Sequence, residues 1–180
     1  MKINETTLEV VRGSVLEIAA DAIVNAANKA MRGGGALDGA IHRAAGPQML
    51  SELKNASPNG AGTAEVVVTK GYNLPQPYVF HVAGPIWSER KIAECDEQLA
   101  ASYRNCLIKA DELSLESIGF PSLSTGVYAF PIERAAPLAL KTAVEYLRTN
   151  PSTTLKTVTF AMFGGAEHHE FRRALEKLES

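Results

Sequence analysis

The chain has 180 residues, of which 46% are hydrophobic and 21% are charged, and its formal net charge is −2. This length and composition are typical of one folded domain and exclude a chain that is disordered over most of its length. The weak net charge also excludes a broad basic face for a nucleic-acid backbone, so nucleic acid is not an expected partner. Any phosphate site must therefore rely mostly on backbone N–H groups and helix ends.

The N-terminal segment and the cysteines bear on the compartment. The first ten residues, MKINETTLEV, lack the apolar core of a secretory signal. No uncharged apolar stretch approaches the ~20 residues of a membrane-spanning helix, so no membrane partner is expected. Cys95 and Cys106 fall in one predicted helix, where a rise of ~1.5 Å per residue places them ~16 Å apart, too far for a disulfide. We therefore expect a reduced, cytoplasmic protein.

Two kinds of segment alternate along the chain. Short runs rich in β-branched or aromatic residues predict strands, and several are apolar throughout, as strands covered on both faces are. In chain order, these runs are residues 8–11, 22–25, 65–69, 78–83, 117–120 and 157–162. Apolar residues spaced three and four apart predict helices at residues 37–45, 48–54, 92–113, 132–148 and 166–178.

This alternation predicts an α/β domain with helices on both faces of a mixed sheet. No helix separates the strands at 65–69 and 78–83, which indicates a hairpin or a sheet edge. No repeat, low-complexity tract or linker divides the chain, and the Asn-Pro-Ser-Thr-Thr stretch at 150–154 is typical of a surface turn. Residues 1–180 are therefore expected to form a single domain.

Three loops follow predicted strands, and the ligands of open α/β sheets bind beyond the C-terminal ends of the strands. In the first loop, Asn25 and Asn28 offer amide groups where the strand gives way to the loop. The glycines that follow, Gly33, Gly34 and Gly35, would let a ligand approach the backbone closely.

The helix after this loop carries Asp38 near its start and His42 one turn later, on the same face. A helix cap and a tight turn would explain Asp38. They would leave the two asparagines and the glycine run unexplained, so we interpret the whole segment as part of a ligand site.

The second loop covers residues 121–131. Ser124, Thr125 and Gly126 could turn successive N–H groups toward an anion, and Val127 and Tyr128 would add an apolar wall. Ser-Thr-Gly is also ordinary turn composition, so the pattern has two interpretations.

The third loop begins at Phe163, which follows a predicted strand and precedes two glycines. An aromatic ring at this place could stack on a nucleobase, although a phenylalanine is more often part of a core.

The residue spacing of three other well-known site motifs does not occur in this chain. A dinucleotide-binding fingerprint that starts at Gly33 would need a glycine where the chain has Asp38. No G-x-x-x-x-G-K-[ST] motif occurs, which excludes a P-loop. Ser124 has Ser122 instead of glycine two residues before it, which excludes a nucleophile elbow.

The histidines do not predict a metal site. His168 and His169 are adjacent and lack the spacing of metal ligands, so we expect them on a solvated helix face. His81 lies inside an apolar run, where a hydrogen-bonded structural histidine is the expected interpretation.

Four motifs occur in a fixed order along nearly the whole chain: DAIVNAAN (21–28), GGGALDGAIHRAAGP (33–47), HVAGPIW (81–87) and FPSLSTGVYAFP (120–131). The FAMF strand at 160–163 and the helix after it complete the set. In these motifs the chain resembles the macrodomain family, and within it the MacroD-type hydrolases. The resemblance implies a three-layer α/β/α fold around a mixed sheet, with ADP-ribose across the sheet's C-terminal edge.

The resemblance also implies roles for the loop residues. Asn28 would hold hydroxyls of the distal ribose, Asp38 would order that ribose and a water near its anomeric carbon, and His42 would support them. The first and second loops would clasp the pyrophosphate from two sides, and Phe163 would pack on adenine or the proximal ribose. The expected catalytic residues are thus Asn28, Asp38 and His42, and the expected ligand contacts are Ser14, Val15, Asn25, Gly33, Gly34, Gly35, Ser124, Thr125, Gly126, Val127, Tyr128 and Phe163. No metal and no cofactor are expected.

Two positions depart from the family pattern. Ala36 replaces the last of four glycines, a change that costs little unless φ is positive there. Ser14 replaces an aspartate that, in most relatives, accepts a hydrogen bond from the adenine amino group. Poorer selection for adenine is therefore expected, unless Ser14 caps the following turn and a backbone group reads the base.

The implied activity is hydrolysis of ADP-ribose esters, either on Asp and Glu side chains of mono-ADP-ribosylated proteins or as O-acetyl-ADP-ribose. Such a reaction needs a positioned water and an anion near the developing oxocarbenium charge, which Asp38 can supply. No second carboxylate is evident beside it, so a paired glycosidase mechanism is not indicated. One alternative is a reader that binds ADP-ribose without turnover; the other is an RNA- or poly(ADP-ribose)-binding scaffold, against which the acidic charge counts.

Overall fold

The structure is a computed structural model that describes residues 1–180. Seven strands form one sheet in the order β1-β2-β7-β6-β3-β5-β4. The strands from β2 to β5 in this order run parallel, whereas β1 and β4 at the two edges are antiparallel to their neighbours. The predicted mixed sheet is confirmed, and so is the edge hairpin of β4 and β5. The strands are β1 (Lys2–Ile3), β2 (Thr6–Arg12), β3 (Ala22–Ala26), β4 (Val66–Lys70), β5 (Tyr78–Val82), β6 (Ser117–Phe120) and β7 (Thr157–Met162).

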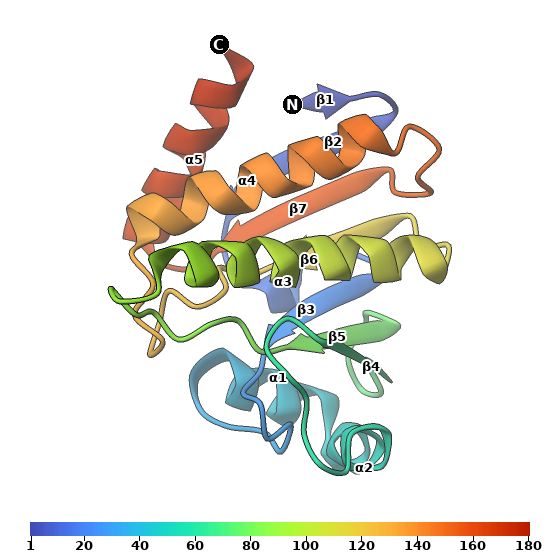
Figure 1. The fold of residues 1–180 in the computed structure, drawn as a ribbon. Coiled ribbons are helices and arrows are strands. Elements are labelled where there is room, and N and C mark those ends of the chain that lie inside the picture. The colour runs from blue at the N-terminus through green and yellow to red at the C-terminus, as the bar shows by residue number, and fades with distance from the viewer.

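Five α-helices cover the two faces of the sheet, and α3 and α4 cross in front of it in Figure 1. Each predicted helix exists, with ends that differ by at most two residues. The helices are α1 (Ala36–Ala45), α2 (Pro47–Ala56), α3 (Ile92–Glu112), α4 (Ile132–Thr149) and α5 (Gly165–Glu179), with a short 3-10 turn, η1, at Val15–Glu17. Pro47 occupies the first turn of α2, where its missing N–H leaves no bond unmade. None of these helices has the length and apolar character to cross a membrane.

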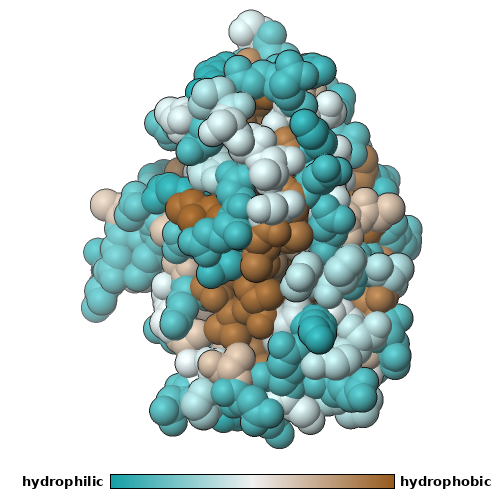
Figure 2. Space-filling view, turned by 90° about the vertical axis from the view of Figure 1, so that its right-hand side faces the viewer, coloured by the Kyte–Doolittle hydropathy of each residue, from teal (hydrophilic) through white to brown (hydrophobic).

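Side chains alternate between the two faces along each strand, and this divides the core into two clusters. Val24 and Phe80 belong to the larger cluster, which packs against α3, α4 and α5. Their chain neighbours Ile23 and Val79 belong to a smaller cluster under α1 and α2. The result is the three-layer α/β/α arrangement that the resemblance implied. The face of the molecule in Figure 2 is mostly hydrophilic, with a hydrophobic patch near its centre.

The sequence analysis missed two short elements. β1 is only two residues long and η1 only three, too short for hydrophobic periodicity to register. Cys95 and Cys106 both lie on α3, buried and unpaired.

Because β3, β5, β6 and β7 are parallel, their C-terminal ends meet at the same edge of the sheet. The three loops singled out from the sequence leave this edge, and so does the segment after β5. The fold therefore brings together segments that are far apart along the chain.

Candidate active site

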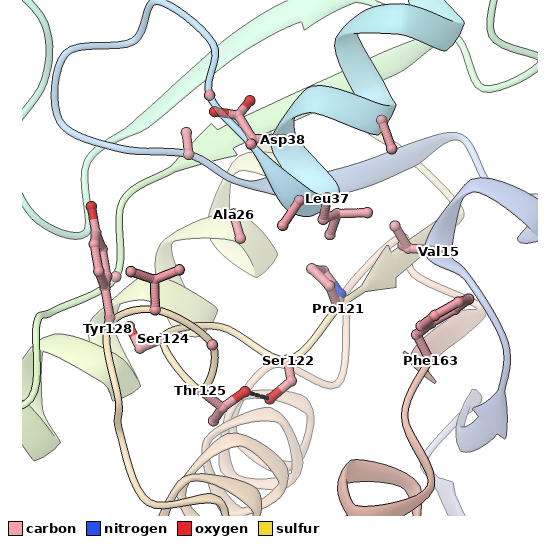
Figure 3. Close-up of a pocket in the computed structure, with 18 of the residues that line it drawn as sticks. Val15, Ala26, Leu37, Asp38, Pro121, Ser122, Ser124, Thr125, Tyr128 and Phe163 are labelled. Atoms are coloured by element: carbon pink, nitrogen blue, oxygen red, sulfur yellow. Dashed lines mark hydrogen bonds between the residues drawn. The ribbon is translucent and has the colours of Figure 1, made fainter.

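The loops at the C-terminal edge of the sheet enclose a cavity of about 580 Å³, within the range of small-molecule sites. In the view of Figure 3, Val15 and Phe163 lie on one side of it and Ser124 and Tyr128 on the opposite side, with Asp38 above. The cavity is therefore elongated, and the groups at its two ends differ.

Asp38 sits in the first turn of α1, where the positive end of the helix dipole favours a carboxylate. Its side chain is almost fully buried but still lines the cavity. The Asn25 side-chain amide donates to its Oδ1 at 2.8 Å. His42 Nε2 lies 3.3 Å from the same oxygen, but neither ring nitrogen of His42 is in hydrogen-bond geometry with any group. Asn25 is thus the one side chain that donates a hydrogen bond to this carboxylate.

Asn28 lies in the loop beside Asp38. Its Nδ2 donates to the carbonyl oxygen of Gly33 at 3.2 Å, and its buried Oδ1 has no partner. A Cβ atom at Gly34 would stand 3.0 Å from Asp38 Oδ2 and 3.3 Å from Asn28 Nδ2. Glycine at position 34 is therefore what allows the amide and the carboxylate to face the same part of the cavity.

The backbone of this loop includes left-handed residues. Gly33 has a φ of +85°, and Ala36, at the start of α1, has a φ of 50°. A left-handed conformation costs a residue with a Cβ about 1–2 kcal/mol relative to glycine. Alanine at position 36 was expected to cost little unless φ is positive there. Because φ is positive, Ala36 destabilises this backbone conformation relative to glycine.

The second loop forms the opposite wall of the cavity and is held in place by a hydrogen bond to Tyr103. Tyr103 on α3 is fully buried, and its hydroxyl accepts a hydrogen bond from Leu123 N at 2.9 Å. Burial raises the pKa of Tyr103, so the hydroxyl stays protonated. Ser122 Oγ and Thr125 Oγ1 are 2.6 Å apart, and this bond closes the turn in Figure 3.

Ser124 is itself in the left-handed region, with a φ of 66°, and its buried hydroxyl has no hydrogen-bond partner. A Cβ atom at Gly84, after β5, would stand 2.2 Å from Ser124 Oγ. Only glycine at position 84 leaves room for the second loop to lie this close to the end of β5.

The two facing loops share a feature that suits an anion. On one side, the N–H groups of Gly34, Gly35 and Ala36 donate to no protein group. On the other, the same is true of each N–H from Ser124 to Tyr128. Both stretches line the cavity, and the first is the N-terminal end of a helix. Unpaired N–H groups at a helix N-terminus or in a turn favour negatively charged groups.

Phe163 and Ser14 mark the other end. Phe163 is 79% exposed, so it is a rim residue and not part of the core. Ser14 Oγ accepts a hydrogen bond from Leu16 N at 3.2 Å and caps η1, although its hydroxyl can still donate. Ser14 thus has the capping role that the sequence analysis held as the alternative, while it also lines the cavity.

Not every expected site residue reaches the cavity. Asn25, Gly33 and His42 lie behind its wall, in contact with Asp38, Asn28 or each other. The other expected residues line it: Ser14, Val15, Asn28, Gly34, Gly35, Asp38, Ser124, Thr125, Gly126, Val127, Tyr128 and Phe163.

The sequence analysis did not single out several residues that line the cavity. They are mostly small or apolar residues of the strand ends and loops: Ala26, Ala27, Leu37, Ala40, Gly84, Pro121, Ser122 and Ala161, together with Glu167 of α5. Ala26 and Ala27 lie between Asn25 and Asn28 in the DAIVNAAN motif, and this position was the available signal. For Glu167 no sequence signal existed, because an acidic residue in the first turn of a helix is ordinary.

His81 is a buried, hydrogen-bonded histidine, as expected. Its Nδ1 lies 3.1 Å from Asn25 Nδ2 and its Nε2 lies 2.9 Å from Thr69 Oγ1. Burial, with a smaller effect of the nearby His42, lowers the pKa of His81 from 6.5 to about 3. The ring is therefore neutral at physiological pH.

Comparison with known proteins gives a consistent result. The Macro domain family model matches residues 24–139. A Macro domain-containing protein of Methanosarcina mazei is 40% identical over 178 residues, which is 99% of this chain and 92% of that protein. A relative with the same name in Lactiplantibacillus plantarum is 43% identical over 171 residues, covering 95% of this chain and 97% of the relative.

Two solved structures extend the comparison. The Oceanobacillus iheyensis macrodomain, solved with ADP, is 38% identical, with a TM-score of 0.93 over 99% of this chain and 95% of that one. The Trypanosoma brucei macrodomain in complex with ADP-ribose is 39% identical, with a TM-score of 0.85 over 93% of this chain and 68% of that one. With this sequence identity and this fold, the chain belongs to the macrodomain family.

Proposed function

We propose that this protein binds ADP-ribose in the cavity and hydrolyses ADP-ribosyl esters there. The observation that carries the proposal is the pair of facing loops whose backbone N–H groups lack partners. A pyrophosphate presents oxygens on two sides, so two such loops match its shape and charge. The related macrodomains solved with ADP and with ADP-ribose support the same ligand class.

The two ends of the cavity suit the two ends of this ligand. Phe163 offers an exposed ring on which an adenine base can stack, next to Val15. Asn28 and Asp38 offer an amide and a carboxylate for ribose hydroxyls at the other end. The scissile bond of an ADP-ribosyl ester lies on that distal ribose, so the proposed reaction takes place beside Asp38.

For an ester whose oxygen is on the anomeric carbon, the proposed step breaks the bond between that carbon and the ester oxygen. A water molecule attacks that carbon, its oxygen forms the new bond and gives up a proton to the solvent, and the carboxylate of the ester leaves with the electron pair of the broken bond. Positive charge develops on the ribose, and the carboxylate of Asp38 stabilises it while accepting a hydrogen bond from the water. The substrate's pyrophosphate, held by the two loops, helps to position the same water.

A paired carboxylate mechanism does not fit this cavity. Glu167 is the other carboxylate in the wall, and its side chain lies against Gly164, next to Phe163. It therefore belongs to the base end, whereas a glycosidase needs two carboxyl groups that flank one bond. Positioning by Asp38 and the loops is the mechanism that these residues support.

The substrates we propose are ADP-ribose esters on Asp and Glu side chains of proteins, or O-acetyl-ADP-ribose. The second candidate is a reader of ADP-ribose without turnover, which would use the same loops.

One experiment tests binding and turnover separately. ADP-ribose at ~100 times its Kd should stabilise the protein by ~2.7 kcal/mol, and inorganic phosphate should not. Incubation with a protein mono-ADP-ribosylated on Glu should then release free ADP-ribose. No thermal shift at millimolar ADP-ribose would refute the ligand, whereas a shift without release would leave the reader role.

A further inference from the structure

A line of buried polar side chains runs from the edge of the sheet to Asp38. Asn25 on β3 is the register partner of His81 on β5, and Thr69 lies on the edge strand β4 beside them. All three side chains are at most 1% exposed. Unpaired polar groups are costly in such a place, so their hydrogen bonds define their orientations.

The protonation of the His81 ring follows from Thr69. The Thr69 hydroxyl has one proton, and it donates to the carbonyl oxygen of Lys70 at 3.0 Å. With its proton on Lys70, the hydroxyl accepts in its contact of 2.9 Å with His81 Nε2, and Nε2 carries the proton. Asn25 supports the same assignment, because its Nδ2 can only donate and lies 3.1 Å from His81 Nδ1. A neutral ring with Nε2–H has a lone pair at Nδ1.

The orientation of Asn25 follows in turn. Its Nδ2 has two protons, of which one points to Asp38 Oδ1 at 2.8 Å and the other to His81 Nδ1 at 3.1 Å. If Nδ1 were protonated, it would face the amide protons, and the Asn25 amide would have to rotate. Asp38 would then lose the one side chain that donates to it.

We propose that Thr69 and His81 are positioning residues, which hold the Asn25 amide so that it orients the Asp38 carboxylate toward the distal ribose. The inference rests on the proposed function, because it concerns the same carboxylate. Neither residue lines the cavity, so each acts through Asn25. Thr69 on the edge strand and the Asn25 amide favour the same direction for each bond in the chain.

Two substitutions of His81 separate the two sides of its ring. In His81→Asn, the side-chain oxygen can take the place of Nδ1 and still accept from Asn25, while the contact with Thr69 is lost. In His81→Gln, the longer amide reaches toward Thr69 and the acceptor beside Asn25 is lost. We expect kcat for ester hydrolysis to fall about tenfold or more in His81→Gln and by less than about threefold in His81→Asn. The Kd for ADP-ribose should change by less than about threefold in both.

The second measurement needs no turnover. Long-range ¹H–¹⁵N correlation spectra of the unmodified protein should show His81 as the Nε2–H tautomer near pH 7. Thr69→Val removes the acceptor for this proton at nearly constant volume, and it should shift the ring toward a mixture of tautomers with a partial loss of kcat.

A ring protonated at Nδ1 in the unmodified protein would overturn the inference, whether or not the protein hydrolyses esters. Equal kcat values for the folded His81→Gln and His81→Asn variants would overturn it as well. If either variant does not fold, the tautomer and the Thr69→Val kinetics decide. Binding of ADP-ribose without release of product would contradict the proposed function alone, because the tautomer is read independently.

Discussion

The two ends of the cavity are built in different ways. At the Asp38 end, polar side chains are buried and joined by hydrogen bonds that run across three strands. At the other end, Phe163 is 79% exposed and Ser14 uses its oxygen to cap η1. Buried, mutually bonded groups keep one arrangement, whereas an exposed ring loses little by turning. We infer that this protein holds the distal ribose strictly and the base loosely.

The largest expected effect on turnover is at the Asp38 end of the cavity. Asp38→Ala should reduce ester turnover by about 100-fold or more, because the anion acts mainly in the transition state. ADP-ribose affinity should change far less, since the two loops remain. Parallel measurements of kcat and of Kd by calorimetry check this. Full turnover in the variant would remove Asp38 from the mechanism.

Two adjacent glycines give a matched pair at the same end. A Cβ at Gly34 would crowd Asp38 Oδ2 at 3.0 Å, whereas one at Gly35 would have no atom within 4 Å. Neither glycine has a positive φ. Gly34→Ala should therefore lower kcat by about tenfold through displacement of the carboxylate, while Gly35→Ala stays within about threefold. Equal losses in the two would indicate that any side chain in this loop obstructs the ligand.

At the Phe163 end of the cavity, a substitution should change the affinity for ADP-ribose more than it changes kcat. Phe163→Ala removes the stacking surface and should raise the Kd for ADP-ribose by about tenfold, corresponding to ~1.4 kcal/mol, with kcat nearly unchanged. Because the ring is mostly exposed, the melting temperature should hardly move. An unchanged Kd would show that the base lies elsewhere.

The smallest effect is expected at Ser14. A serine hydroxyl can donate as well as accept, so it tolerates the carbonyl of hypoxanthine. The protein should distinguish ADP-ribose from its inosine counterpart by no more than about tenfold, or ~1.4 kcal/mol. Ser14→Asp should widen this gap, because a charged acceptor contributes ~1.5–3 kcal/mol against ~0.5–1.5 kcal/mol for a neutral one. A strong adenine preference that this substitution leaves unchanged would mean that Ser14 only caps η1.

Most helices and strands could be predicted because their apolar residues recur with the spacing typical of a helix or a buried strand. Strands such as Ala22–Ala26 are apolar on both faces and helices have one apolar stripe, and only elements of two or three residues escaped. The candidate site was predictable as a set of loops, since the C-terminal ends of parallel strands must meet.

The roles of individual side chains at the site were less predictable. Asn25 was expected to contact the ligand because it stands where the strand gives way to the loop, yet its side chain is buried behind Asp38. His81 was recognised as structural, but its link to Asp38 depends on which strands are neighbours in the sheet. Such relations arise from tertiary packing, which sequence spacing does not contain.

The walls of the cavity contain no lysine and no arginine. A ligand held by neutral backbone dipoles releases few counterions from fixed cations, so its affinity should depend only weakly on ionic strength. Because these donors belong to the main chain, proline is the substitution that removes a donor itself. A dianionic ligand in this cavity would thus be recognised by the shape of the main chain, and the walls offer a long polyanion no row of cations.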